Sequence, residues 1–291
     1  MASKINQYNW VDKNVFPFKS NYFQTKSGKI HYVDEGEGEI ILFVHGTPTW
    51  SFLYRNFISA LSKEYRCIAV DNLGFGLSDK PEGFDGTPEA HANNLSQFIQ
   101  ELNLSNITLV VHDFGGPIGL GAAIKNHNRI KQVIMFNTWL WETKSNKGAR
   151  KVDKILNSTI GKFLYLRMNF SPKVLLKKGF YGKKRLTKKV HKQYILPFPN
   201  KSSRWSLLNI GKSLVGSSSW YEQQWEQLHD LESKPWLILW GIKDEFVTLE
   251  YLEKWRQRLT NSKVVKFDCG HFVQEEKPTE AIKEIQKFLK R

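Results

Sequence analysis

Short apolar runs recur along the chain, and each is followed by a polar or glycine-rich loop. They lie at 29–34, 40–44, 67–71, 107–111, 133–137, 236–240 and 264–268. Most are continuously apolar, which is typical of strands buried on both faces of a sheet. Between several of them the apolar positions follow helical spacing, as at Leu95, Phe98, Ile99 and Leu102. This alternation predicts an α/β fold with a mostly parallel sheet and helices on both faces.

The alternation stops after residue 137 and resumes near residue 236. From 138 to 222 the chain is basic, contains several glycines and prolines, and has no buried-strand pattern. We therefore predict a core made of residues 1–137 and 223–291 and an inserted helical cap made of residues 138–222. The insertion leaves from the edge of the sheet where the ligand site of an open α/β sheet is expected.

One stretch stands out at that edge, where the strand ending at Val111 runs into His112, Asp113 and Phe114 and then into two glycines. A buried strand that meets small residues and then a helical pattern predicts a tight turn, which lifts one side chain clear of the sheet. Asp113 has the place that serine takes in the G-x-S-x-G motif. Alternatively, Asp113 merely caps the next helix, because Asp is a favoured N-cap residue.

Two more reactive side chains follow later strands. Asp244 comes after the strand at 236–240, and His271 comes after the strand at 264–268. Either one alone could be structural, as a turn-capping carboxylate or a packed histidine. Together with Asp113 they give the order nucleophile, acid, histidine that is found in α/β-hydrolases. Because the carboxyl ends of parallel strands meet at one edge, we expect the three to converge there as catalytic residues.

Composition and charge narrow the function classes. The chain has 291 residues, 41% hydrophobic residues and a net charge of +15, and from 144 to 212 it has 19 Lys or Arg against one acid, Asp153. The cap therefore holds the excess charge, either as a solvated face or as a surface for an anionic membrane or protein partner. No nucleic-acid module accompanies it, so no nucleic-acid partner is expected.

No run approaches the roughly 20 apolar residues of a membrane span, and Met1 to Tyr8 hold no apolar leader segment. Cys67 and Cys269 have no metal-ligand spacing. These features predict a cytoplasmic protein without a metal or other cofactor.

Four motifs together resemble those of the haloalkane dehalogenases of the α/β-hydrolase fold. They are His45-Gly46-Thr47-Pro48-Thr49-Trp50, Asp71-Asn72-Leu73-Gly74-Phe75-Gly76, His112-Asp113-Phe114-Gly115-Gly116 and Gly270-His271-Phe272. The likeness runs from about residue 29 to the end of the chain and is weakest in the cap. It implies a small apolar substrate and a hydrolase with an aspartate nucleophile.

The resemblance also implies a mechanism. An ionised Asp113 would displace the leaving group and form an alkyl-enzyme ester. A neutral His271, held by Asp244, would activate the water that cleaves the ester. Backbone N–H groups of Thr47 and Phe114 would form the oxyanion hole.

The chain departs from the family where the leaving halide is bound. Haloalkane dehalogenases usually place a tryptophan after the nucleophile and an asparagine in the His-Gly-x-Pro loop, or a second tryptophan from the cap. Here Phe114 and Thr47 occupy the two core positions, and phenylalanine has no side-chain N–H. Candidates for a substituting indole N–H at the substrate are Trp50, Trp139 and Trp141.

Three other functions remain open. Epoxide hydrolases of the same fold protonate a leaving oxygen with cap tyrosines, for which Tyr165, Tyr181, Tyr194 and Tyr221 are candidates. Enzymes that process β-lactones share the core motifs. Finally, the fold could serve as a binding module whose basic cap docks a partner, although such a module has no need for Asp113, Asp244 and His271.

Overall fold

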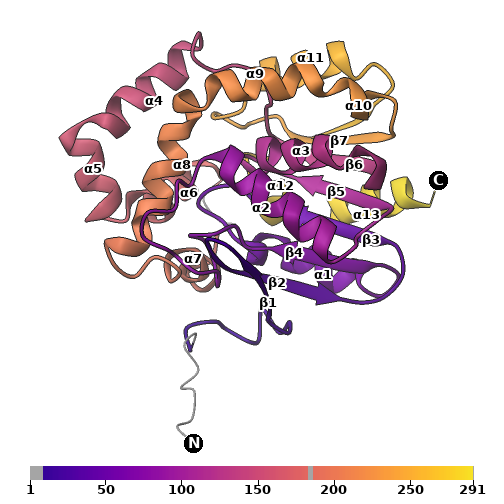
Figure 1. Cartoon of the computed structure of the whole chain (residues 1–291), viewed down its shortest axis with the longest axis horizontal. Helices are drawn as coiled ribbons and strands as arrows, with labels where there is room; N and C mark the ends of the chain where they lie inside the picture. Colours follow the sequence, from indigo (N-terminus) through magenta and orange to yellow (C-terminus); the bar gives the residue numbers. More distant parts are fainter. Residues whose placement is uncertain (1–8, 183–185, 291) are drawn as a thin grey trace, which may run out of the picture.

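Eight strands form one sheet at the centre of the molecule (Figure 1). The computed structural model describes residues 9–182 and 186–290. The strands stand in the order β1-β2-β4-β3-β5-β6-β7-β8; β1 and β2 pair antiparallel, β2 and β4 pair antiparallel, and all later pairs are parallel. Their bounds are β1 (Asn21–Thr25), β2 (Gly28–Glu35), β3 (Ile40–Val44), β4 (Arg66–Val70), β5 (Ile107–Val111), β6 (Ile130–Phe136), β7 (Trp236–Gly241) and β8 (Lys263–Phe267). The predicted α/β class with a mostly parallel sheet is confirmed.

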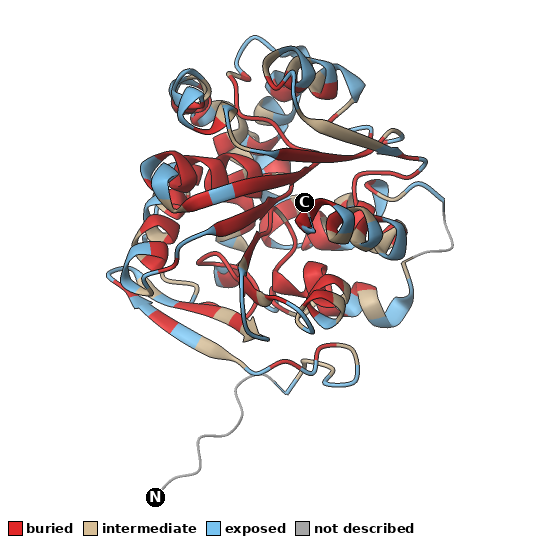
Figure 2. Ribbon diagram, turned by 90° about the vertical axis from the view of Figure 1, so that its right-hand side faces the viewer, coloured by how far each residue is buried: buried red, intermediate tan, exposed pale blue. Residues whose placement is uncertain are grey.

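Helices cover both faces of the sheet, and the strands alternate their side chains between the two cores. On β3, Leu42 and Val44 belong to one apolar cluster, whereas Ile41 and Phe43 belong to the other. The first cluster packs α2 (Pro88–Glu101), α3 (Gly115–Lys125), α9 (Ser218–Gln227) and α11 (Leu249–Arg258) against the sheet. The second packs α1 (Arg55–Leu61), α12 (Val273–Glu276) and α13 (Pro278–Leu289). Buried residues accordingly fill the centre of the molecule, and exposed ones mark the outer faces of the helices (Figure 2).

The edge strand β1 is the one described strand that the apolar pattern did not predict. Its residues alternate between exposed and buried positions, with Phe23 and Thr25 inward, and it forms a hairpin with β2. An edge strand covered on one face carries fewer apolar residues than the central strands do. A five-residue alternation is too short to be distinguished from a loop by periodicity.

The chain between β6 and β7 is helical, as predicted for the cap. It contains α4 (Lys147–Asn157), α5 (Thr159–Leu166), η3 (Ser171–Leu175), α6 (Leu176–Lys178), α7 (Lys188–Ile195), η4 (Ser202–Arg204) and α8 (Trp205–Gly216), followed by α9 and α10 (His229–Glu232). The predicted boundary at residue 222 falls inside α9, which packs against α3 of the core. Figure 1 shows α4 and α5 at one edge of the molecule, away from the sheet.

The sequence predicted neither a leader segment nor a membrane span. Residues 1–8, on which the expectation of no leader segment rests, lie outside the described residues. Across 9–182 and 186–290, no helix is both long enough and apolar enough to cross a membrane.

Candidate active site

Asp113 stands at a sharp turn between β5 and α3. Its φ is +52°, a left-handed conformation that Asp tolerates better than most residues do. Its backbone N–H donates to the carbonyl of Asn137 at 3.0 Å, which ties the turn to the end of β6. Space beside it is tight, because a Cβ on Gly46 would lie 2.1 Å from Oδ1 of Asp113. The turn thus depends on a strained backbone at one residue and on a glycine at another.

The two oxygens of the Asp113 carboxylate have different partners. The backbone N–H of Thr47 donates to Oδ1 at 2.8 Å, and the backbone N–H of Phe114 also donates to the carboxylate. Oδ2 lies 3.5 Å from Nε2 of His271. Burial by itself would raise the pKa of Asp113, but the bonds and charge of His271 hold it below its usual value. The carboxylate is therefore ionised, with Oδ1 fixed and Oδ2 facing the imidazole.

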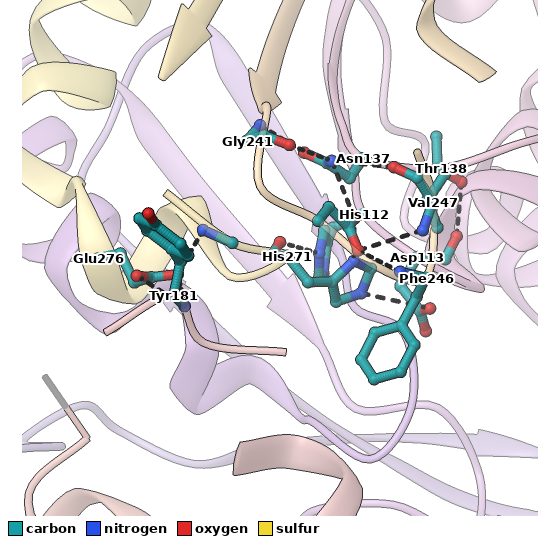
Figure 3. A network of polar contacts seen from close by, with 12 residues as sticks. His112, Asp113, Asn137, Thr138, Tyr181, Gly241, Phe246, Val247, His271 and Glu276 are labelled. Atoms are coloured by element: carbon teal, nitrogen blue, oxygen red, sulfur yellow. Dashed lines mark hydrogen bonds and ion pairs between the residues drawn. The ribbon is translucent and has the colours of Figure 1, made fainter. Parts of the chain in front are cut away.

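His271 joins the two carboxylates. Its Nδ1 lies 2.6 Å from Oδ2 of Asp244, and dashed lines in Figure 3 connect His271 with Asp113. Burial would lower the pKa of His271, but the charges and hydrogen bonds of Asp244 and Asp113 outweigh it and raise the pKa to about 10. In the resting site the two carboxylates therefore favour the protonated ring. The neutral His271 expected from the sequence belongs to the later ester stage and stays a prediction.

Asp244 is held in place by its own loop and by a neighbouring strand end. Its Oδ1 accepts from the N–H groups of Phe246 at 2.8 Å and Val247 at 3.1 Å, and its Oδ2 accepts from Nδ2 of Asn137 at 2.9 Å. Oδ1 of Asn137 in turn accepts from the N–H of Gly241 at 2.8 Å. Sequence reasoning placed Asn137 at the right sheet edge but gave it no role. The signal was a buried polar residue that ends an apolar strand.

His112 is a second buried imidazole beside the site. Its Nε2 donates to the carbonyl of His271 at 3.0 Å, and the two rings lie 4.4 Å apart between centroids (Figure 3). Burial, and next the charge of His271, lower the pKa of His112 to about 3. The ring is therefore neutral, and it supports the backbone of the catalytic histidine without adding charge.

The loop that carries His271 is joined to the cap. The N–H of His271 donates to the carbonyl of Gly179 at 2.7 Å. The buried carboxylate of Glu276 accepts from the N–H of Gly270 at 2.8 Å and from the N–H of Tyr181 at 3.1 Å (Figure 3). Backbone groups of the cap and of the His271 loop thus find hydrogen-bond partners in each other and in the carboxylate of Glu276.

Two buried donors near Asp113 have no partner within the described part of the chain. They are the hydroxyl of Thr47 and the indole N–H of Trp139. The ring of Trp139 packs edge-on against Phe114, with centroids 4.9 Å apart. Buried donors without partners are rare and costly, so each requires an explanation.

The other two tryptophans named as substrate residues have partners of their own, and their role at the substrate stays a prediction. The indole N–H of Trp50 donates to the carbonyl of Gln193 at 3.0 Å, so it is not available to a leaving group. Trp141 packs among Trp225, Tyr251 and Trp255 beside α9 and α11. Both positions follow from packing partners that are distant in sequence, which periodicity does not reveal.

The four cap tyrosines differ in position. Tyr194 donates to Glu275, and the hydroxyl of Tyr221 donates to the carbonyl of Ser213 at 2.8 Å. Tyr181 is half exposed. Burial, together with the negative charge of Asp113, raises the pKa of Tyr165 to about 12 and also raises that of Tyr221. Tyr165 and Tyr221 are therefore the two that respond to Asp113 electrostatically.

The residues present offer no metal site in the part of the chain that the structure describes. Within these residues, His, Cys, Asp and Glu form no group of three that could hold an ion. Cys67 and Cys269 are buried free thiols.

Comparison with known proteins gives one family and two kinds of relative. The family model described as "alpha/beta hydrolase fold" matches residues 39–278. A cis-3-alkyl-4-alkyloxetan-2-one decarboxylase of Shewanella oneidensis is 33% identical over 289 residues, covering 94% of this chain and 89% of the relative. Haloalkane dehalogenase 2 of Mycobacterium tuberculosis is 33% identical over 270 residues, covering 92% of this chain and 93% of the relative.

Solved structures agree with these relatives. The crystal structure of the haloalkane dehalogenase DatA from Agrobacterium tumefaciens C58 superimposes with a TM-score of 0.84 at 27% identity. The match covers 94% of this chain and 96% of that structure.

Proposed function

This chain belongs to the α/β hydrolase fold family and is a haloalkane dehalogenase-like enzyme. We propose that it cleaves small apolar substrates through an ester on Asp113. The observation that supports the proposal most strongly is the arrangement of Asp113, His271 and Asp244. Two backbone N–H groups hold the carboxylate of Asp113, and the carboxylate of Asp244 orients the ring of His271. The cap of residues 138–222 would cover this site.

In the first step Oδ2 of Asp113 attacks the substrate carbon, and the bond from carbon to the leaving group breaks with its electron pair on the leaving group. Oδ2 is suited to the attack because Oδ1 is already held by Thr47. Oδ1 then becomes the carbonyl oxygen of the ester and stays in the oxyanion hole, which Thr47 and Phe114 form.

In the second step water attacks the carboxyl carbon of Asp113. Esterification removes the negative charge next to Nε2 of His271, so the pKa of His271 falls and the neutral ring becomes a base. His271 takes a proton from the water, the ester bond breaks, and the alcohol leaves with that proton. Asp244 stabilises the imidazolium that forms. The second proton of the water leaves the Asp113 carboxyl through His271 to solvent, which restores the carboxylate.

The leaving group needs donors, because an unpaired charge in a buried site is unfavourable. We propose that the hydroxyl of Thr47 and the indole N–H of Trp139 provide them. Neither has a partner among the described residues, and both are buried. The N–H of Thr47 itself donates to the Asp113 carboxylate, and the ring of Trp139 packs on Phe114, whose N–H also donates to it. Trp139 would thereby substitute for the tryptophan that follows the nucleophile in related enzymes.

A second candidate is the opening of a strained ring, an epoxide or a β-lactone. The relative named as an alkyloxetanone decarboxylase favours it, as does the buried position of Tyr165, whose hydroxyl feels the charge of Asp113. In such a substrate the leaving oxygen stays attached, and a tyrosine hydroxyl could donate to it. Products discriminate the two: halide and alcohol from one, a diol or an alkene from the other.

The test is to trap the ester. His271→Gln keeps the nucleophile but removes the base, so intact-mass measurement should show an adduct after incubation with a haloalkane, epoxide or β-lactone panel. Asp113→Asn is the matched control and should show none. Absence of an adduct with every panel member, in a variant that melts like the wild type, would refute the covalent mechanism.

Isotope labelling checks the second step. After one turnover in H₂¹⁸O, the label should appear in the peptide that contains Asp113, because water attacks the carboxyl carbon and not the substrate. Label found only in the product would show direct hydrolysis and would contradict the ester route.

A further inference from the structure

Exposed apolar side chains gather on the outer part of the cap. Most of the large apolar residues with exposed side chains lie between residues 152 and 181, and Ile160 is 72% exposed. The others in helices α4 and α5 and shortly after them are Val152, Ile155, Phe163, Met168 and Val174. A soluble surface rarely concentrates such residues in one segment, so this grouping indicates an interaction surface.

Helix geometry places these side chains together. On α5, Ile160 and Phe163 are three residues apart and share the face opposite the buried Gly161 and Tyr165. On α4, Val152 and Ile155 are also three apart. Ser158 caps the start of α5 by accepting from the N–H of Gly161, so the chain turns between the two helices. Figure 1 shows the resulting pair at the outer edge of the cap.

The same segment is densely cationic. From residue 147 to residue 178 every Lys and Arg is exposed, including Lys151 and Lys154 on α4 and Lys162 on α5. Among the described residues none of them forms an ion pair. Asp153, the acid in this segment, is bonded to Nδ2 of Asn157. The positive charge is therefore free to meet an anionic partner.

We propose that the α4–α5 face of the cap docks on the surface of an anionic lipid membrane. Lysines and arginines would contact the headgroups, and the side chains of Ile160 and Phe163 would enter the boundary between headgroups and acyl chains. This combination distinguishes a membrane from nucleic acid, whose phosphate backbone offers no place for exposed apolar side chains. The projecting position of the two helices suits a flat surface.

This surface is independent of the chemistry at Asp113. Docking would bring the cap to the layer in which apolar molecules concentrate. The carbonyl of Gly179, which directly follows the cationic segment, contacts the N–H of His271, so this segment ends at the loop that carries His271.

Vesicle co-sedimentation with the full chain tests the proposal. Wild type should bind vesicles of phosphatidylcholine mixed with phosphatidylserine and not phosphatidylcholine alone, and added salt should weaken binding. Lys151→Glu/Lys154→Glu/Lys162→Glu should weaken it about tenfold or more. The matched control is Lys26→Glu/Lys63→Glu/Lys283→Glu, which makes the same change of net charge at exposed core positions and should have little effect.

A second pair of variants isolates the apolar contact without changing charge. Ile160→Ser/Phe163→Ser should weaken binding about fivefold, whereas Tyr22→Ser, at an exposed core position, should not. Three results would overturn the proposal: no binding to anionic vesicles, equal losses in the cap and core charge variants, or full binding by Ile160→Ser/Phe163→Ser. Salt-sensitive binding to DNA or to an acidic protein without vesicle binding would assign the face to that partner instead.

Discussion

The catalytic edge of the core and the outer cap use polar groups in opposite ways. Around Asp113 and Asp244 nearly every charge is buried and paired, and the backbone itself provides donors at 2.8 Å to both carboxylates. On α4 and α5 the charges are exposed and unpaired within the described residues, and apolar side chains stand beside them. The groups at the core edge are thus held in fixed positions, as the proposed chemistry requires, whereas those of the outer cap are exposed, as the proposed docking requires.

Among the contacts between the cap and the core, one reaches the loop that carries His271. The cap provides the carbonyl of Gly179 and the N–H of Tyr181, and the core provides His271 and Glu276. Because these contacts involve main chain, they fix the distance between the cap and the catalytic loop without depending on cap side chains. Substitutions near Asp113 should therefore change turnover, and substitutions on α4 and α5 should not.

The largest effect is expected from Gly46→Ala. The added Cβ would lie 2.1 Å from Oδ1 of Asp113, so the carboxylate must move, and a displacement of about 1 Å costs roughly 10²-fold in rate. Gly216→Ala in the cap is the matched control, because no atom lies within 4 Å of its added Cβ. kcat/KM should fall only in the first variant. Normal kcat/KM in Gly46→Ala would show that the carboxylate position is not critical.

Trp139→Phe should have the next largest effect. It keeps the ring that packs on Phe114 and removes only the unpartnered indole N–H. If that group binds the leaving group, kcat/KM for a haloalkane should fall by up to about 10²-fold, the low end for a lost donor to developing charge, because the hydroxyl of Thr47 remains as the second donor. Trp141→Phe, within the aromatic cluster, serves as the control. Equal effects of the two would remove Trp139 from the leaving-group site.

The third expectation concerns pH. The folded pKa of His271, about 10, lies above the ordinary value of about 6.5 in an unfolded chain, so the folded state holds the extra proton between these values. The stability this gives is complete below about pH 6.5 and is lost as the pH rises through about 10. The melting temperature of wild type should therefore fall over that range.

Asp113→Asn removes one of the charges that raise the pKa of His271, so that pKa should fall. Imidazole ¹⁵N resonances followed through a titration measure it, and the melting curve should lose stability at lower pH than in wild type. Asp153→Asn is the control. An unchanged titration of His271 in Asp113→Asn would contradict the explanation given for its proton.

The smallest effect is expected in the cap. Ile160→Ser/Phe163→Ser alters only exposed side chains, so the free energy of unfolding should change by no more than about 0.5 kcal/mol. Turnover of a substrate dissolved in water should be unchanged. A marked loss of turnover without vesicles present would mean that the cap face also shapes the active site, and the comparison between the two regions would fail.

The sequence by itself determined the sheet and the order of the chemistry. Continuous apolar runs predicted the central strands to within a few residues. A strand buried on both faces is apolar at every position, so its ends are visible in the sequence. Asp113, Asp244 and His271 could be named because each follows such a strand, and parallel strands carry their ends to one edge. The edge strand β1 lacks that pattern and was missed.

Only the tertiary structure decided which polar groups meet. It joined Asn137 to Asp244, gave the N–H of Trp50 to Gln193, and left the N–H of Trp139 without a partner among the residues it describes. It also put His271 between two carboxylates, which raises the pKa of the ring. Hydrogen bonds and pKa values depend on distances of a few ångströms between residues far apart in the chain, and a linear pattern does not contain those distances.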